Sequence, residues 1–219
     1  MAAKGATVEA LESLYRAGFF THYAGEGAVK SCKIGHGSEQ VDLCTCRTLA
    51  SFSEEGNTRI VTLDPVTIEF EDLSVQVQTV FRLTEGTGEV EIVRRILDST
   101  DPEAELSVDE YITACYGTTE YPEDMTGIRL TLTNTDKIES IDYAYQCRES
   151  ELENVHCVEA LIPQVDSRLS IRTDASSDAS AIGYFREGFS FSPMYTLGIR
   201  KTIKAKGELR TWLKVAKAS

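Results

Sequence analysis

The residues best suited to chemistry lie between positions 98 and 124, where nine carboxylates occur without a single lysine or arginine. Three tyrosines are interleaved with them. Carboxylates accept hydrogen bonds from vicinal hydroxyls, while aromatic rings cover the apolar C–H side of a sugar ring. The stretch therefore predicts a carbohydrate site. The side chains expected to contact the sugar are Glu110, Tyr116, Glu120, Tyr121 and Asp124.

The same stretch has two other interpretations. Hard cations also take oxygen ligands, so calcium is an alternative occupant. The chain has no Asp-x-Asp-x-Asp-Gly loop, however, and we assign no metal ligands and expect no cofactor other than calcium. The third interpretation needs no ligand: residues 98–102 form a solvated turn, and a strand over residues 106–115 follows, with its tyrosine packed in the core.

The six cysteines bear on location and on metal binding. The N-terminus lacks a basic start followed by an apolar core, and no run of about 18 apolar residues occurs, so we expect a cytoplasmic protein without a membrane span. Free thiols are then the expected state. Cys44 and Cys46 point the same way if they lie on a strand, as zinc ligands do, but a structural zinc site usually has two such pairs. Buried thiols are the preferred interpretation.

The net charge of −13 is concentrated in the middle of the chain. Residues 61–150 contain 6 Lys and Arg against 20 Asp and Glu. Such a surface repels phosphate backbones, which excludes nucleic acid as an expected partner. The tail from residue 196 is basic, and there Arg200, Lys201, Lys204 and Lys206 are expected on the solvated face of a hairpin.

Strands must position all of these side chains, because apolar and polar residues alternate from about residue 66 to residue 215. The segments 75–78, 128–132 and 169–172 are clear examples of half-buried antiparallel strands. We predict an all-β antiparallel sandwich with few short helices, formed by residues 1–219 as a single domain. Residues 1–60 contribute N-terminal strands and a short helix near residues 7–16, and residues 60–215 form the main sandwich.

The order of strands and turns is similar to that of a known family. A strand ends at Phe81-Arg82-Leu83, a turn follows at residues 85–88, and strands follow over residues 89–97 and through Tyr111. Residues 197–213 look like a closing hairpin with a glycine turn. This order resembles the galactose mutarotase-like β-supersandwich of aldose epimerases and of domains associated with glycoside hydrolases. The resemblance implies that fold and a carbohydrate ligand.

The resemblance also implies catalytic candidates. Aldose epimerases use a histidine acid near mid-chain and a glutamate base shortly before the closing hairpin, a pairing suited to proton transfer at the anomeric centre. Glu187 lies at about the position of the glutamate. The expected histidine is absent, since Asp109-Glu110-Tyr111 stands there, and His156 is the candidate that remains. If the protein is an enzyme, the resemblance implies an epimerase, hydrolase or lyase.

Two functions are therefore predicted from the sequence. The first is a carbohydrate-binding or carbohydrate-processing β-sandwich whose ligand is a sugar or oligosaccharide. The alternative is a non-catalytic interaction or assembly module that uses an exposed sheet face or edge to hold a partner protein or a second copy. The aromatic-rich residues 184–195 either fill the core or form such a contact patch.

Overall fold

The computed structural model describes residues 32–115, 129–133, 138–142, 148–162, 167–174, 181–188 and 194–217. In this part the chain is almost entirely β-strand, with one 3-10 turn, η1 (Leu43–Thr45). The helix predicted near residues 7–16 lies outside the described residues. Within them, no helix has the length and hydropathy needed to cross a bilayer.

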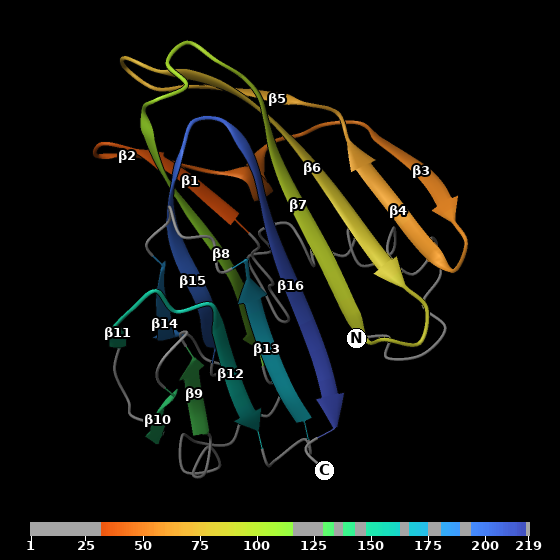
Figure 1. Ribbon diagram of the computed structural model, residues 1–219, viewed down its shortest axis with the longest axis vertical. Helices are drawn as coiled ribbons and strands as arrows, with labels where there is room; N and C mark the ends of the chain where they lie inside the picture. Colours follow the sequence, from red (N-terminus) through yellow and green to blue (C-terminus); the bar gives the residue numbers. More distant parts are fainter. Residues whose placement is uncertain are drawn as a thin grey trace.

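The strands form two sheets, in which every pairing is antiparallel (Figure 1). The six-stranded sheet consists, in spatial order, of β11 (Arg148–Glu153), β14 (Ala181–Gly188), β15 (Met194–Lys204), β8 (Glu105–Cys115), β1 (Cys32–His36) and β2 (Glu39–Asp42). β15 and β8, far apart in sequence, pair along their whole length.

The second sheet has ten strands and includes the long central trio β16, β7 and β6 (Figure 1). Its spatial order is β10 (Ile138–Asp142), β9 (Arg129–Thr133), β12 (Cys157–Ile162), β13 (Ser167–Thr173), β16 (Gly207–Lys217), β7 (Glu89–Ser99), β6 (Ser74–Thr84), β4 (Thr58–Leu63) and β3 (Ala50–Glu55). The tenth strand, β5 (Val66–Glu69), pairs with residues 74–77 of β6, on the same edge of β6 as β4.

The core lies between the two sheets because side chains alternate along each strand. Phe81 and Ile92 are buried on the inner face of the ten-stranded sheet, and Ile34 and Leu106 are buried in the six-stranded sheet. The predicted all-β antiparallel sandwich is confirmed. The predicted closing hairpin is not formed, because β15 pairs with β14 and β8 while β16 pairs with β13 and β7. The glycine turn at Gly207, with φ +83°, instead joins β15 of one sheet to β16 of the other.

A second expectation for this part of the chain is also wrong. Lys201 was expected on the solvated face, but it is buried and its Nζ donates to the backbone oxygen of Asp174 at 2.8 Å. The reason is its position two residues from Ile199 and Ile203, which places it on the apolar face of β15. Lys204, on the opposite face, is exposed as expected.

Lys201 gives the protein a specific dependence on pH. Burial lowers the pKa of this ammonium, an effect that Asp174 partly offsets. Because the folded pKa lies below the unfolded value of about 10.4, the charged form opposes folding, and stability rises with pH between the two values. Lys201→Met should therefore be more stable than wild type near neutral pH, with an advantage that shrinks as the pH approaches about 10.4.

Urea unfolding of wild type and Lys201→Met at several pH values between about 7 and 10.5 tests this dependence. Tyrosine and cysteine titrations are common to both proteins and cancel in the difference. Lys204→Met, at an exposed position of the same strand, is the matched control. A stability difference between Lys201→Met and wild type that is constant over the whole range would contradict the account.

Candidate functional site

The candidate site is the face of the ten-stranded sheet that is turned away from the six-stranded sheet. On β7, Ile92 and Arg94 point into the core, so Glu91, Val93 and Arg95 point to the opposite side. We call this surface the charged face. It consists of Arg82, Glu91, Arg95, Arg172, Glu208, Arg210 and Trp212, with their neighbours on the same side of the sheet.

A single row of residues in register crosses this face from one edge of the sheet to the other. In spatial order the row is Ile138, Thr133, Cys157, Arg172, Trp212, Glu91, Arg82, Ile60 and Ser53. Its centre places a cation, an aromatic ring, a carboxylate and a second cation side by side. Side chains directly opposite one another on neighbouring antiparallel strands lie close enough to interact.

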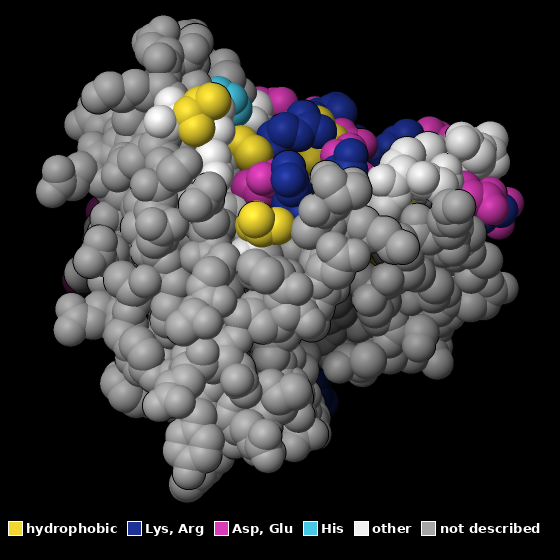
Figure 2. Space-filling view, turned by 90° about the horizontal axis from the view of Figure 1, so that it is seen from below, with side chains coloured by type: hydrophobic (Ala, Val, Ile, Leu, Met, Phe, Trp, Pro, Cys, Tyr) yellow, Lys and Arg dark blue, Asp and Glu magenta, His cyan; other side chains and the backbone are white. Residues whose placement is uncertain are grey.

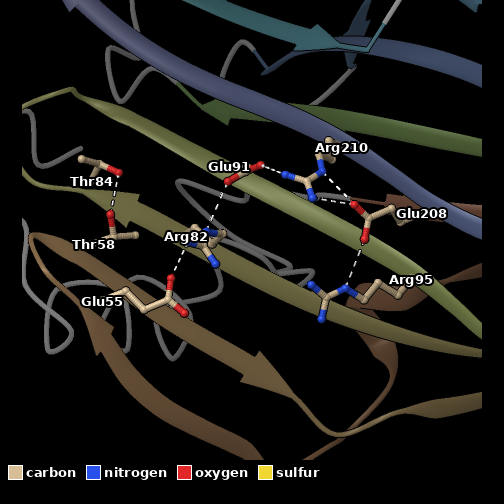
Figure 3. A network of polar contacts seen from close by, with 8 residues as sticks. All are labelled: Glu55, Thr58, Arg82, Thr84, Glu91, Arg95, Glu208 and Arg210. Atoms are coloured by element: carbon tan, nitrogen blue, oxygen red, sulfur yellow. Dashed lines mark hydrogen bonds and ion pairs between the residues drawn. The ribbon is translucent and has the colours of Figure 1, made fainter. Parts of the chain in front are cut away.

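Glu91 is the centre of a network of ion pairs on this face (Figure 3). Its Oε1 accepts a hydrogen bond from Arg210 Nη1 at 2.9 Å, and its Oε2 lies 3.4 Å from Arg82 Nε. Arg82 also donates from Nη2 to Glu55 Oε2 at 2.7 Å. The network thus connects β16, β7, β6 and β3.

The network continues along β16 to Glu208 (Figure 3). Arg210 Nη2 donates to Glu208 Oε1 at 2.6 Å, and Arg95 Nε lies 3.3 Å from Glu208 Oε2. The hydrogen bond from Arg210 lowers the pKa of the Glu208 carboxyl, and the hydrogen bond and charge of Arg95 add to this effect. Every carboxylate of the network is therefore held close to at least one guanidinium group.

Trp212 adds an aromatic surface to the row. The guanidinium carbon of Arg172 lies 4.1 Å from the centroid of the indole ring, within cation–π distance. Arg172 Nη2 is also 3.4 Å from Glu89 Oε2, a long contact for an ion pair. An indole, guanidinium donors and carboxylate acceptors thus lie within one small area.

Apolar residues lie beside this row on the same face. Ile60, Val80 and Val93 form a small hydrophobic cluster and are buried, although they project away from the main core. Figure 2, which views the molecule from below, shows basic and acidic side chains interspersed with hydrophobic ones. The indole of Trp212, together with the hydrogen-bond donors and acceptors around it, is a surface that can bind an amphipathic ligand.

The described residues give no sign of a metal centre. No group of three or more His, Cys, Asp or Glu side chains among them is arranged to hold an ion. Cys46 and Cys157 form no disulfide, as expected for these two, and burial raises the pKa of both thiols. The side chain of Cys44, which was considered with Cys46 as a pair of zinc ligands, lies outside the part of the chain that the structure describes.

Glu110 lies in the core rather than on the charged face. Its Oε1 accepts from Arg94 Nε at 2.7 Å and its Oε2 from Arg94 Nη2 at 3.3 Å, and both side chains are almost fully buried. Arg94 Nη1 also donates to Thr79 Oγ1 at 2.7 Å. A sugar hydroxyl cannot reach this carboxylate while Arg94 holds it, so we leave Glu110 out of the proposed site.

Tyr111, the tyrosine of the strand over residues 106–115, is buried in agreement with the interpretation that needs no ligand. Its hydroxyl donates to Asp42 Oδ2 at 3.2 Å. The remaining predicted sugar contacts, Tyr116, Glu120, Tyr121 and Asp124, lie outside the described residues, and their role stays a prediction.

The two catalytic candidates lie on different parts of the fold. Glu187 is on β14, where its register partner is Tyr195 of β15. His156 directly precedes β12, and its backbone N–H donates to the carbonyl of Thr133 at 2.9 Å. The Nδ1 atom of His156 is buried and has no hydrogen-bond partner in the described part of the chain. The catalytic pairing stays a prediction.

The residues of the charged face were missed in the sequence analysis, although a signal for them exists. Trp212 lies two residues from both Arg210 and Lys214, so alternation puts the chain's only tryptophan on the polar side of its strand. Glu89 and Glu91 alternate in the same way. Alternation shows which side of a strand a residue is on, but it does not show which strands are neighbours. The row could therefore not be predicted from the sequence.

Comparisons with known proteins show a likeness in fold. No family model matches the sequence, and no curated protein matches it. Among solved structures, the chain is similar to a candidate aldose 1-epimerase from Escherichia coli K12, with a TM-score of 0.51 and 7% identity over 86% of this chain and 84% of that one.

A second similar structure is a quadruple mutant of the alpha-N-acetylgalactosaminidase NagBb from Bifidobacterium bifidum, with a TM-score of 0.54 and 8% identity. The match covers 86% of this chain but only 31% of that one, so the chain spans about a third of that enzyme. At such identities the likeness concerns the fold alone. The two sheets of this chain therefore form a galactose mutarotase-like β-sandwich.

Proposed function

We propose that this protein binds a carbohydrate on the charged face of its ten-stranded sheet. The observation that carries the proposal is the central row, in which Trp212 lies between Arg172 and Glu91 on one side of the sheet. Two of the fold neighbours are, by name, a candidate aldose 1-epimerase and an alpha-N-acetylgalactosaminidase, which is consistent with a carbohydrate ligand.

The side chains of the row can bind both the apolar C–H face and the hydroxyl groups of a sugar. An indole ring packs against the apolar C–H face of a pyranose, while carboxylates and guanidinium groups bond to its hydroxyls. Ile60, Val80 and Val93 lie beside the row but are buried, so the indole of Trp212 is the apolar surface assigned to the ligand. A ligand with an apolar side and a rim of hydroxyls therefore matches the face better than a plain anion does.

The ion pairs of the face do not prevent such binding. Arg172, Arg82 and Arg210 are each about a third to a half exposed. Exposed ion pairs contribute only about 0–1 kcal/mol, so their hydrogen bonds can be exchanged for bonds to sugar hydroxyls at small cost. In this scheme Arg172 moves off the indole, and its donors turn to the ligand.

We propose binding and assign no turnover. Glu187 remains the candidate base and His156 the candidate acid, as the resemblance to aldose epimerases implies. Neither belongs to the central row of the charged face: Glu187 is in the six-stranded sheet, and His156 precedes β12. The proposal for binding therefore stands independently of the catalytic candidates.

The experiment is a thermal-shift screen against neutral monosaccharides, uronic acids and short oligosaccharides, each with and without calcium. A ligand that binds only the folded state raises the melting temperature. At a concentration about 100 times the dissociation constant, the expected rise is about 5–10 °C for a chain of this size. If no member of any sugar class changes the melting temperature at millimolar concentration, the carbohydrate proposal is wrong.

A further inference from the structure

The last strand of the ten-stranded sheet, β3, has an open edge. In spatial order it is the final described strand, paired only with β4 on one side. Residues 51–55 are all exposed, so neither face of the strand is covered. Figure 1 shows the β3–β4 hairpin at the outer side of the sheet, away from β11 and β14. An uncovered edge of this kind can pair with another strand.

The backbone groups available on this edge can be assigned. Asp64 N–H donates to Leu49 O at 2.9 Å, which directs the backbone groups of Leu49 toward β4. Because these groups alternate in direction along a strand, those of Ala50, Phe52 and Glu54 point outward. Three residues thus each offer one N–H and one C=O to a second strand.

From this arrangement we propose that the protein forms a symmetric dimer through antiparallel pairing of β3 with β3 of a second copy. The register that uses all three outward residues places Phe52 opposite Phe52 of the other copy, on the two-fold axis. Ala50 then lies opposite Glu54, and each such pair exchanges two hydrogen bonds. Self-complementarity of one surface patch is what a two-fold interface requires.

The side chains of β3 suit this register. Phe52 is 41% exposed and continues a row of inner-face residues through Val61 and Phe81. Pairing across the two-fold axis brings the two Phe52 rings together and extends that apolar row into the second copy. Leu49, 76% exposed, directly precedes the strand. Burial of such aromatic and aliphatic surface favours association.

Charges on the edge are arranged so that they do not oppose pairing. Glu54 pairs with Arg59 at 3.1 Å, and Glu55 pairs with Arg82 at 2.7 Å. In the proposed register each glutamate faces an uncharged residue of the other copy, because Glu54 lies opposite Ala50 and Glu55 opposite Leu49. Charged side chains without a counter-charge often prevent edge strands from pairing, and among the described residues of β3 none is present.

The hairpin that carries the edge is well braced. It closes with a two-residue turn in which Gly56 adopts φ +60°, a conformation common in tight hairpins. Thr58 Oγ1 and Thr84 Oγ1 lie 3.0 Å apart, and Arg82 holds Glu55, so the hairpin is tied to β6 (Figure 3). A strand held in place in advance loses little conformational entropy on pairing.

The mass of the full chain in solution tests the proposal. Light scattering and sedimentation should give twice the chain mass of 24.2 kDa at high concentration. Ala50→Pro removes an outward N–H without touching the bonds to β4, and the two copies together lose two hydrogen bonds. The dissociation constant should rise about 30-fold, whereas the matched control Ala50→Ser should leave it unchanged.

A second variant covers the outcome in which Ala50→Pro fails to fold. Phe52→Lys places two ammonium groups on the two-fold axis and should also abolish the dimer, while circular dichroism verifies the fold. A wild-type protein that stays monomeric up to about millimolar concentration would overturn the proposal. So would a dimer that persists in folded Phe52→Lys, because it would then use another surface.

Discussion

Replacement of Arg94 by methionine is expected to lower the free energy of unfolding by about 3–5 kcal/mol. Arg94 gives two hydrogen bonds to Glu110 and one to Thr79, and its guanidinium carbon lies 5.8 Å from the centroid of the Phe81 ring. The side chains of Arg94 and Glu110 are only 4% and 2% exposed. Removal of the cation leaves a buried carboxylate without its counter-charge.

A double variant separates loss of the ion pair from loss of packing. Arg94→Met combined with Glu110→Met replaces both charges by apolar side chains of similar length, and should recover most of the stability, since such replacements are often neutral or stabilising. The matched control is Arg95→Met, the next residue on the strand, whose side chain is 43% exposed. Its expected cost is below about 1 kcal/mol.

Urea denaturation of the four proteins gives these values, provided that the m-values agree. Two results would count against the assigned role of the pair. One is a cost below about 1 kcal/mol for Arg94→Met. The other is a double variant that is no more stable than Arg94→Met, because the buried carboxylate would then not be the source of the loss.

Substitution of Trp212 by alanine should weaken sugar binding by about 100-fold, once the thermal-shift screen has identified the ligand class. Aromatic anchors typically contribute 2 kcal/mol or more to binding, and Trp212 is the one aromatic side chain assigned to the central row of the charged face. Trp212→Phe keeps an aromatic surface and should lose much less.

Further variants locate the ligand on the sheet. Glu91→Gln keeps the shape of the side chain but removes its charge, and should weaken binding by about 10-fold through loss of charge-assisted hydrogen bonds. Glu105→Gln, an exposed carboxylate of the six-stranded sheet, is the matched control and should bind as wild type does. Titration calorimetry on folded variants provides the comparison. Equal affinities for Glu91→Gln and Glu105→Gln would place the sugar elsewhere.

Much of the fold could be predicted from local patterns. Alternation identified β6, β13 and the last two strands, β15 and β16, because each strand has one apolar and one polar side, but it did not show that β15 and β16 lie in different sheets. It could not identify the order of strands in the sheets, since β16 pairs with β7 and β13 over long sequence separations. The central row of the charged face depends on that order.

The same limit explains the charged residues that lie inside the protein. Arg94 follows Val90 and Ile92 at alternate positions, and Glu110 follows Leu106 and Val108 in the same way. Each is therefore a charge on an apolar strand face, and the pattern already indicates burial. It does not indicate that the two strands face each other across the core, which is what pairs the charges.

Lys201 follows the same rule on β15, with Ile199 and Ile203 at alternate positions. The basic composition of the tail suggested a solvated face, but alternation places only Arg200 and Lys204 away from the apolar side. Position within the alternation therefore outweighs local charge when the side of a strand is assigned.

The fluorescence of Trp212 provides the most direct test of the proposed site, because it is the only tryptophan in the chain. The measurement is a titration of the wild-type protein with the sugar that raises its melting temperature, followed by tryptophan emission. The account predicts a saturable change in emission whose dissociation constant equals that from calorimetry. A sugar that binds by calorimetry and leaves the emission of Trp212 unchanged would contradict binding on the charged face.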